Sequence, residues 1–471
     1  MPRSGWWAID LRARAARPNA LRSWESNHLS DGSDASSVPN LSLDVALFGR
    51  NRGGCGPLAL VGGADLPIWE MPLCSVQDPT SPPCIVCGSP NIVPIFEIPA
   101  LPADTIRLWS SRAAACSAPK APMGLTYCEN CGHLFNRCYD DNLVDYEADY
   151  ENSQMFSPRF RRYAEELSDR LIATYNLRQK DIVEIGGGRG DFLRIICDRG
   201  YNNGVSFGPS YRPAAGDDVP GNVRFVTDYY TAKYAAVPAN LIVCRHVLEH
   251  FWEPRPLIDT VRQAVGDRKD LVVYFEVPNG EFILRKQIFW ELIYQHPSYF
   301  TQSSLAKLFT MCGFEVRDIQ ESFGSQFLAI EASAPAHGAI LDRDSFCENK
   351  SNTAALGRAL SAAFSEKVAS WRDRLERLHN KGQRIVAWGA GAKAVTFLNV
   401  VDPVGSLISH VVDINPRKTG RFVPGSGQEI VEPNSLKELH PDVIILMNEI
   451  YRDEIASHIA GLGLNPEFLV A

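Results

Sequence analysis

Short apolar runs alternate with helical patterns through the middle of this chain. The runs have the length of buried strands, and they lie at 181–185, 204–207, 223–226, 241–244 and 271–275. Between them apolar residues recur at helical spacing, as in 191–197. An earlier helix is expected to start at Ser157, with Pro158 in the favoured first-turn position. Strands that alternate with helices predict an α/β fold built on a doubly wound parallel sheet.

A second α/β pattern occupies the last part of the chain. An amphipathic helix comes first, and its apolar stripe, which we interpret as core, consists of Leu360, Phe364, Val368, Trp371, Leu375 and Leu378. An apolar run then leads into Gly389-Ala-Gly391-Ala-Lys393-Ala394, and Asp413 ends the next apolar run. This order predicts a second Rossmann-like domain. A Gly-x-Gly-x-x-Ala turn with a later acidic residue is also the form of a dinucleotide site, so NAD binding is one alternative.

A glycine-rich turn follows the first apolar run of the central pattern. Its sequence is Glu184-Ile-Gly186-Gly-Gly188-Arg-Gly190, directly before a helical segment. Glycines allow a tight turn and a close backbone approach to a ligand, and the start of the helix presents free N–H groups. Ligands of such sheets bind beyond the carboxyl ends of the strands. The polar residues expected around that crevice are Glu184, Asp228, Arg245 and His246.

Two Cys-x-x-Cys-Gly turns precede this pattern. They contribute Cys84 with Cys87 and, after 40 intervening residues, Cys128 with Cys131. Each turn presents two thiols, and together they predict one tetrahedral four-cysteine site for a structural Zn²⁺. Because the separation exceeds the common spacing, an iron–sulfur or redox site is the alternative.

Composition limits the function classes. A net charge of −8 without a Lys/Arg stripe argues against nucleic-acid binding. No apolar run approaches the roughly 20 residues of a membrane span, and the 12 cysteines of a chain without a secretory start predict reduced thiols and a cytoplasmic protein. Residues 1–80 are Arg-rich and then rich in Ser, Gly, Pro and Asn, which predicts a disordered extension, with a transit peptide as the alternative. Nothing in the sequence indicates an oligomeric state.

The Glu-x-Gly-x-Gly-x-Gly turn resembles motif I of class I S-adenosylmethionine (SAM)-dependent methyltransferases. Together with the cysteine turns, Phe323-Gly-Ser and the carboxyl-terminal glycines, it resembles the zinc-containing sugar C-methyltransferases, over about residues 82–471. The resemblance implies a four-cysteine zinc-binding module at 81–145, a SAM domain at 146–335 and an acceptor-side C-methyltransferase domain at 336–471. The implied acceptor is a small molecule, a nucleotide-linked keto sugar.

The resemblance also implies roles for individual residues. Glu184 would face the cationic part of SAM, the glycines at 186, 188 and 190 would line the cofactor, and Asp228 would contact the adenine. His296 would be the base that removes a proton beside a ketone, so that the resulting enolate attacks the methyl group. The residues implied around that reaction are Tyr150, Tyr294 and Gln295, with Gly389, Gly391 and Lys393 on the acceptor side.

Two positions depart from the family pattern. Gln295 stands where the family has Glu beside the base, and Gly208 stands where an acidic residue usually binds the ribose, so that Ser206, Ser210 or a backbone amide would have to replace it. A heteroatom nucleophile needs less help from a base than a C–H acid does. The alternatives are therefore an O- or N-methyltransferase acting on another polar metabolite, and a catalytically inert nucleotide-sugar-binding protein.

Overall fold

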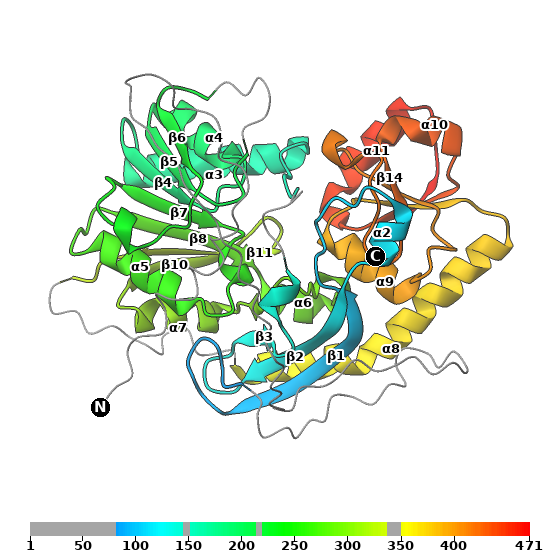
Figure 1. The fold of residues 1–471 in the computed structure, drawn as a ribbon, viewed down its shortest axis with the longest axis horizontal. Coiled ribbons are helices and arrows are strands. Elements are labelled where there is room, and N and C mark those ends of the chain that lie inside the picture. Colours follow the sequence, from blue (N-terminus) through cyan, green and yellow to red (C-terminus); the bar gives the residue numbers. More distant parts are fainter. Residues whose placement is uncertain (1–81, 145–150, 213–218, 337–349) are drawn as a thin grey trace, which may run out of the picture. The chain divides into compact units, whose positions relative to one another are not determined.

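The computed structural model describes residues 82–471 except 145–150, 213–218 and 337–349 (Figure 1). The predictions made for residues 1–80 and for Tyr150 lie outside the described residues.

The central domain is built on a seven-stranded sheet with the order β10-β11-β8-β7-β4-β5-β6. Its strands are β4 (Asp181–Ile185), β5 (Asn203–Phe207), β6 (Val223–Val226), β7 (Leu241–Arg245), β8 (Val272–Pro278), β10 (Glu315–Ser322) and β11 (Phe327–Ser333). Strands β4 to β8 are parallel, whereas β11 runs antiparallel to both β8 and β10. The parallel strands predicted from the apolar runs are confirmed.

Helices cover both faces of this sheet (Figure 1). Side chains alternate across each strand, so Ile182 packs with α3 (Pro158–Tyr175) and α4 (Asp191–Gly200), whereas its neighbour Val183 belongs to the core formed with α5 (Arg255–Val265) and α7 (Gln302–Met311). Helix α3 starts where the sequence predicts, because the Ser157 hydroxyl accepts a hydrogen bond from the Phe160 amide. Helix α6 (Gly280–Lys286) follows β8.

The cysteine module contains an antiparallel sheet with the order β1-β2-β3-β9. Its own strands are β1 (Ile92–Pro102), β2 (Lys120–Cys128) and β3 (Leu134–Asn136), with the short helix α2 (Arg112–Cys116) between the first two. The fourth strand, β9 (Ser298–Tyr299), comes from the central part of the chain and pairs Tyr299 with Leu134. The sheet therefore extends beyond the segment 81–145 that the sequence delimits.

The last domain has a five-stranded, wholly parallel sheet with the order β14-β13-β12-β15-β16. Its strands are β12 (Ile385–Trp388), β13 (His410–Val412), β14 (Glu429–Val431), β15 (Val443–Leu446) and β16 (Glu467–Val470), and its helices are α8 (Lys350–Asn380), α9 (Ala392–Val401), α10 (Leu436–Leu439) and α11 (Arg452–Gly461). The apolar stripe of α8 packs into one core with β1, β2 and α9, as its interpretation as core predicts.

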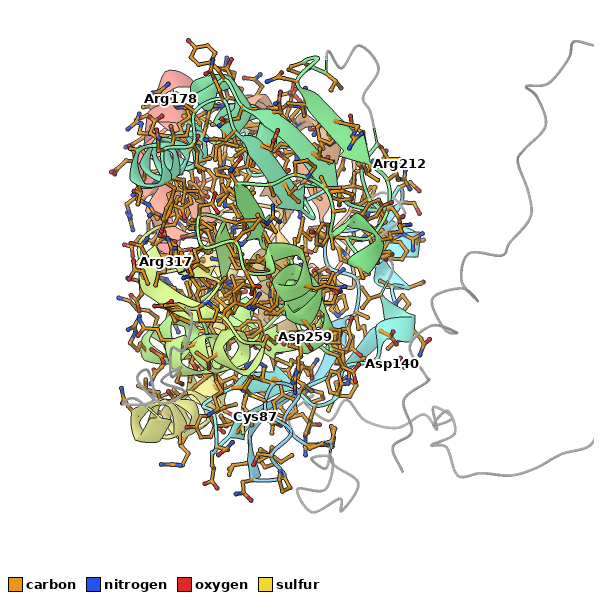
Figure 2. All side chains as sticks on the ribbon, turned by 90° about the vertical axis from the view of Figure 1, so that its left-hand side faces the viewer. Cys87, Asp140, Arg178, Arg212, Asp259 and Arg317 are labelled. Atoms are coloured by element: carbon orange, nitrogen blue, oxygen red, sulfur yellow. The ribbon has the colours of Figure 1, made fainter. Side chains whose placement is uncertain are left out.

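Short 3-10 helices complete the described elements: Asp141–Leu143, Ala232–Tyr234, η4 (Leu248–His250), η5 (Phe289–Glu291), Pro416–Lys418, Pro433–Ser435 and Glu449–Tyr451. Among the described helices, none combines the length and the hydropathy needed to cross a bilayer. On the face drawn in Figure 2, the exposed arginines Arg178, Arg212 and Arg317 lie well apart from one another.

Candidate active site

The glycine turn links β4 to α4 in a conformation that favours glycine. Gly186, Gly188 and Gly190 have φ values of +72°, +56° and +75°. A Cβ atom at Gly186 would lie 2.3 Å from Val247 Cγ2, and one at Gly190 would lie 2.1 Å from a ring carbon of Phe225. The turn is therefore packed on its underside, and no larger residue fits at either position.

Glu184 lies directly beneath this turn. Its Oε2 accepts a 3.1 Å hydrogen bond from the Ser206 hydroxyl, and a Cβ atom at Gly187 would lie 1.8 Å from the same oxygen. Burial raises the pKa of Glu184 to about 7, although the hydrogen bond from Ser206 opposes that rise. The Ser206 hydroxyl thus donates to Glu184 and keeps only its acceptor capacity for a ligand.

The ends of β5 and β6 border the glycine turn. Gly208 follows β5, and a Cβ atom there would lie 3.7 Å from the Cα of Gly186, which is the place expected for a ribose-binding residue. Asp228 follows β6, where its carboxylate forms an ion pair with Lys233 and accepts a 2.7 Å hydrogen bond from the Tyr234 hydroxyl. Both positions lie at the predicted carboxyl edge of the sheet.

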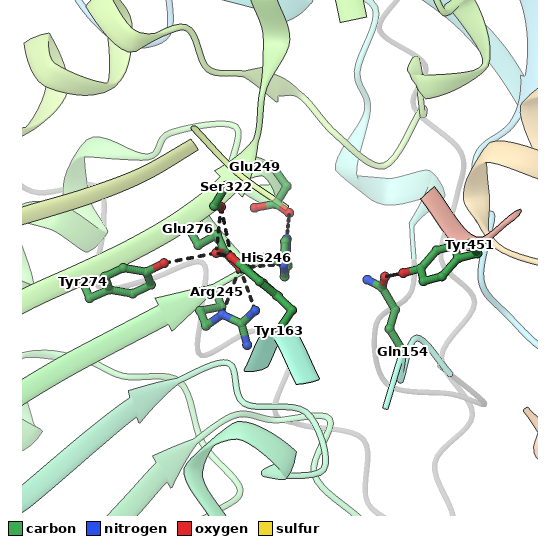
Figure 3. A network of polar contacts seen from close by, with 9 residues as sticks. All are labelled: Gln154, Tyr163, Arg245, His246, Glu249, Tyr274, Glu276, Ser322 and Tyr451. Carbon is green, nitrogen blue, oxygen red and sulfur yellow. Dashed lines mark hydrogen bonds and ion pairs between the residues drawn. The ribbon is translucent and has the colours of Figure 1, made fainter. Parts of the chain in front are cut away.

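Arg245, at the end of β7, is paired with a carboxylate that sequence reasoning missed. The Arg245 Nε and Nη2 atoms lie 2.9 and 2.7 Å from Oε1 of Glu276 on β8 (Figure 3). Glu276 is fully buried, and although burial alone opposes ionisation, Arg245 and His246 hold its pKa well below the usual range. The sequence signal that could have identified Glu276 is an acidic residue within the otherwise apolar run 272–277.

Three hydroxyl groups complete the surroundings of Glu276 (Figure 3). Tyr163 of α3 donates to Oε2, and the hydroxyls of Tyr274 and Ser322 lie 3.1 and 3.3 Å from the same oxygen. His246 has a φ of +56° and places Nε2 3.1 Å from Glu276 Oε1. The contacts of Arg245 and His246 are thus made to a buried acid, which fixes the wall of the crevice.

His296 lies in a group of histidines. Its ring centroid is 4.7 Å from that of His250, at an interplanar angle of 81°. Burial, followed by the neighbouring His250 and His246, lowers the pKa of His296 well below its usual value. Burial also lowers the pKa of His250 to about 4. Both imidazoles are therefore neutral at physiological pH.

The side chains of Tyr294 and Gln295 contact the cysteine module. The Tyr294 hydroxyl accepts a 2.9 Å hydrogen bond from the Asp140 amide and donates to the carbonyl of Cys138 at 3.1 Å. Gln295 Oε1 accepts from the Thr105 amide at 3.0 Å, and its Nε2 donates to Asp104 at 3.2 Å. Figure 2 labels Asp140, which lies at the exposed margin of this module. The structure thus gives both side chains partners in the module.

The acceptor-side residues lie at the start of α9. Lys393 forms an ion pair with Glu291 of η5 and donates to Gln326 at 3.1 Å, so it bridges to the central domain. Gly389 has a φ of +105°, and Gly391 is the N-cap residue of α9.

In the NAD alternative, the carboxylate of Asp413 is expected to bind the ribose, but it already has partners within the protein. Asp413 Oδ2 accepts from the Ala390 amide at 2.8 Å and lies 3.3 Å from Lys418 Nζ. Asp413 therefore braces the glycine turn of the last domain, which argues against the dinucleotide alternative.

The four predicted zinc ligands converge. The sulfur atoms of Cys84 and Cys131 are 3.6 Å apart, as are those of Cys87 and Cys128, and all four lie within 4.8 Å of one another. A tetrahedron with Zn–S bonds of about 2.3 Å has sulfur–sulfur edges of about 3.8 Å. The geometry fits a four-thiolate metal site.

Sequence reasoning also missed Glu151, which is 3% exposed. Its carboxylate lies 3.4 Å from Arg189 Nε in the glycine turn and 3.3 Å from Arg417 Nη1 in the last domain. Asn415 Nδ2 donates to its second oxygen at 3.1 Å. A single buried carboxylate thus joins the glycine turn to the last domain.

Two family models match separate parts of the chain. A methyltransferase domain matches residues 155–319, and a C-methyltransferase C-terminal domain matches residues 347–465. The chain therefore combines a methyltransferase domain with a C-methyltransferase C-terminal domain.

One curated relative and several solved structures resemble this chain. The relative is "C-methyltransferase NovU" of Streptomyces niveus, 23% identical over 310 residues, which are 62% of this chain and 72% of the relative. An O-methyltransferase family protein from Burkholderia thailandensis is 17% identical and matches 38% of this chain and 59% of that chain, with a TM-score of 0.30. Magnesium protoporphyrin IX methyltransferase from Synechocystis is 15% identical and matches 37% of this chain and 84% of that chain, with a TM-score of 0.29.

Proposed function

We propose that this protein is a SAM-dependent C-methyltransferase that methylates a carbon atom beside the ketone of a nucleotide-linked keto sugar, with His296 as the general base. The observation that carries the proposal is a neutral, partly buried His296 that lies against His250 on a loop joined to the cysteine module. A base must be unprotonated to accept a proton, and the low pKa of His296 keeps it so at neutral pH.

The proposed cofactor site is the glycine turn with the strand ends beside it. The backbone at Gly186, Gly188 and Gly190 leaves room for close approach, Glu184 offers a carboxylate to a cation, and Asp228 offers an acceptor to the adenine amino group. SAM, when bound, supplies the electrophilic methyl group. Arg245 and His246 form the adjoining wall, where Glu276 holds them in place.

The residues of the chain then carry out the remaining steps. His296 accepts the proton from the acceptor carbon, and the electron pair of that C–H bond delocalises onto the ketone oxygen. The enolate carbon would then form the new C–C bond as the S–CH3 bond of the sulfonium breaks, and its electron pair would stay on sulfur to leave S-adenosylhomocysteine. The residues around the acceptor contribute by positioning that carbon for the transfer. The acceptor and its phosphates are proposed to contact Gly389, Gly391 and Lys393. Lys393 would then leave its ion pair with Glu291 and bind the ligand instead.

Tyr294 and Gln295 are proposed to position His296 through their contacts with the cysteine module. We propose Zn²⁺ as the resident ion of the four-cysteine site, because a closed four-thiolate site is typical of structural zinc. A cytoplasmic location is proposed because the nine cysteines among the described residues form no disulfide bond.

A second candidate function is O- or N-methylation of a polar metabolite. It is favoured by the position of Gln295, whose side-chain amide bonds to Thr105 and Asp104. His296 therefore has no carboxylate at position 295 to raise its basicity. An oxygen or nitrogen nucleophile can react with a weaker base than a C–H acid needs.

The test separates proton removal from methyl transfer. The protein is incubated in D₂O with S-adenosylhomocysteine and nucleotide-linked keto-deoxyhexoses, and deuterium uptake beside the ketone is followed by NMR. Uptake that is lost in His296→Ala and retained in Gly186→Asp supports the base assignment. A parallel reaction with methyl-¹³C SAM identifies the methylated atom, and a methyl group bonded to oxygen or nitrogen would favour the second candidate.

A further inference from the structure

Glu249, His250 and His296 bring three metal-ligating groups together from two segments of the chain. Glu249 and His250 are consecutive in η4, and His296 lies just before β9. One ligand atom from each residue lies within 4.8 Å of the other two. Zinc binds nitrogen and oxygen ligands at about 2.0–2.2 Å, so two ligand atoms of one ion lie no more than about 4.4 Å apart, which is close to the spacing of these three atoms.

The orientation of His250 is that of a metal ligand. Its Nδ1 lies 3.0 Å from the carbonyl oxygen of Gln295, so Nδ1 carries the proton and Nε2 keeps its lone pair. Metal-ligating histidines usually donate their other N–H group to a backbone carbonyl or a carboxylate in this way.

Glu249 adds an independent observation. The residue is 1% exposed, and its Oε2 is buried without a hydrogen-bond partner among the described residues. A buried carboxylate oxygen without a partner is unfavourable unless a cation or an ordered water satisfies it. The neighbouring imidazoles favour a cation, because both offer nitrogen lone pairs.

We infer that Glu249, His250 and His296 form a binding site for a divalent transition-metal cation, separate from the four-cysteine site. Two imidazoles with one carboxylate match the ligands that Zn²⁺ and Co²⁺ accept. A bound cation occupies the lone pair of His296, so cation binding and proton abstraction by that residue exclude each other. The cation site itself does not rest on the proposed function.

The test is a titration of the zinc-loaded full-length protein with Co²⁺, without SAM or acceptor. We expect one further Co²⁺ per chain, with visible ligand-field bands and without the intense thiolate charge-transfer absorption that cobalt in the cysteine site would give. His250→Gln and Glu249→Gln, measured separately, should weaken binding by more than the roughly 10- to 100-fold typical of losing an outer-shell partner.

His379→Gln, which changes an exposed histidine on α8, is the matched control and should leave the titration unchanged. Absence of cobalt uptake beyond the cysteine site would overturn the inference, as would uptake that both folded ligand variants retain. Circular dichroism identifies a variant that fails to fold. Because the readout requires no turnover, a negative methylation assay leaves this result interpretable.

Discussion

The amide N–H of Asn136 donates a 2.9 Å hydrogen bond to the carbonyl oxygen of Pro297, the residue that follows His296. The pairing continues through Phe135 and Ser298. On the same side, the Thr301 hydroxyl donates to the carbonyl of Gly132, in the second cysteine turn, at 3.1 Å. The cysteine module thus supports the loop that carries the proposed base, and we expect the proposed metal site to affect catalysis through this loop.

Removal of the metal should therefore lower turnover more than it lowers the affinity for the cofactor. In Cys128→Ser the second cysteine turn loses a ligand, the pairing of β3 with β9 loosens, and His296 loses its fixed position. We expect kcat to fall by at least about tenfold, because a shift of a catalytic group by about 1 Å can lower the rate roughly 100-fold. Steady-state rates and calorimetric titration with S-adenosylhomocysteine measure the two effects. Cys116→Ser, at an exposed cysteine of the same module, is the control. Unchanged turnover in a zinc-free protein would contradict this role.

Gly187→Ala should abolish cofactor binding. The new Cβ atom would meet Glu184 Oε2 at 1.8 Å, so either the carboxylate or the turn must move. Titration with S-adenosylhomocysteine measures the loss. Gly461→Ala, where no atom lies within 4 Å of the added Cβ, should bind normally. Wild-type affinity in Gly187→Ala would show that the cofactor does not use this turn.

Cofactor affinity should depend on the ionisation of Glu184. Its pKa is about 7 in the cofactor-free protein, and a bound cation favours the carboxylate, so binding releases a proton. Affinity for SAM should rise with pH and level off above about pH 7, with a limiting slope of about tenfold per pH unit below it. Calorimetry in buffers of different ionisation enthalpy measures the proton release. Glu184→Gln should bind more weakly and without this pH dependence, and a persisting slope would assign it to another group.

Glu276→Gln should destabilise the central domain strongly. The change leaves the guanidinium of Arg245, whose side chain is 9% exposed, without its counter-ion. Loss of one partner of a buried ion pair costs about 3–5 kcal/mol in the free energy of unfolding. Urea denaturation measures it. Asp169→Asn breaks the exposed pair with Arg199 and should cost no more than about 1 kcal/mol. Equal effects of the two changes would argue against a buried, ionised Glu276.

Arg417→Gln should weaken cofactor binding from the last domain. Arg417 and Arg189 both contact Glu151, so removal of one charge changes how the carboxylate holds the glycine turn. We expect a rise in Kd of about tenfold, equivalent to about 1.4 kcal/mol. Arg384→Gln, at an exposed arginine of the same domain, is the control. Equal affinity of the two variants would show that Glu151 does not couple the domains.

Local patterns in the sequence were enough to predict those elements whose formation depends on residues close together in the chain. Apolar periodicity is local, so it located β4 to β8, the start of α3 and the buried stripe of α8. The glycine turn and the four cysteines were also readable, because backbone freedom and ligand spacing are properties of short segments.

Contacts between residues far apart in the sequence could be seen only in the folded structure. The pairing of β9 with β3, the burial of Glu276 beside Arg245, and the meeting of Glu151 with Arg189 and Arg417 join positions that no periodicity connects. The same holds for Gln295, whose side chain turns to Asp104 and Thr105. Such contacts arise when separate elements pack together, because most buried polar groups must find a partner and that partner often lies far away in the sequence.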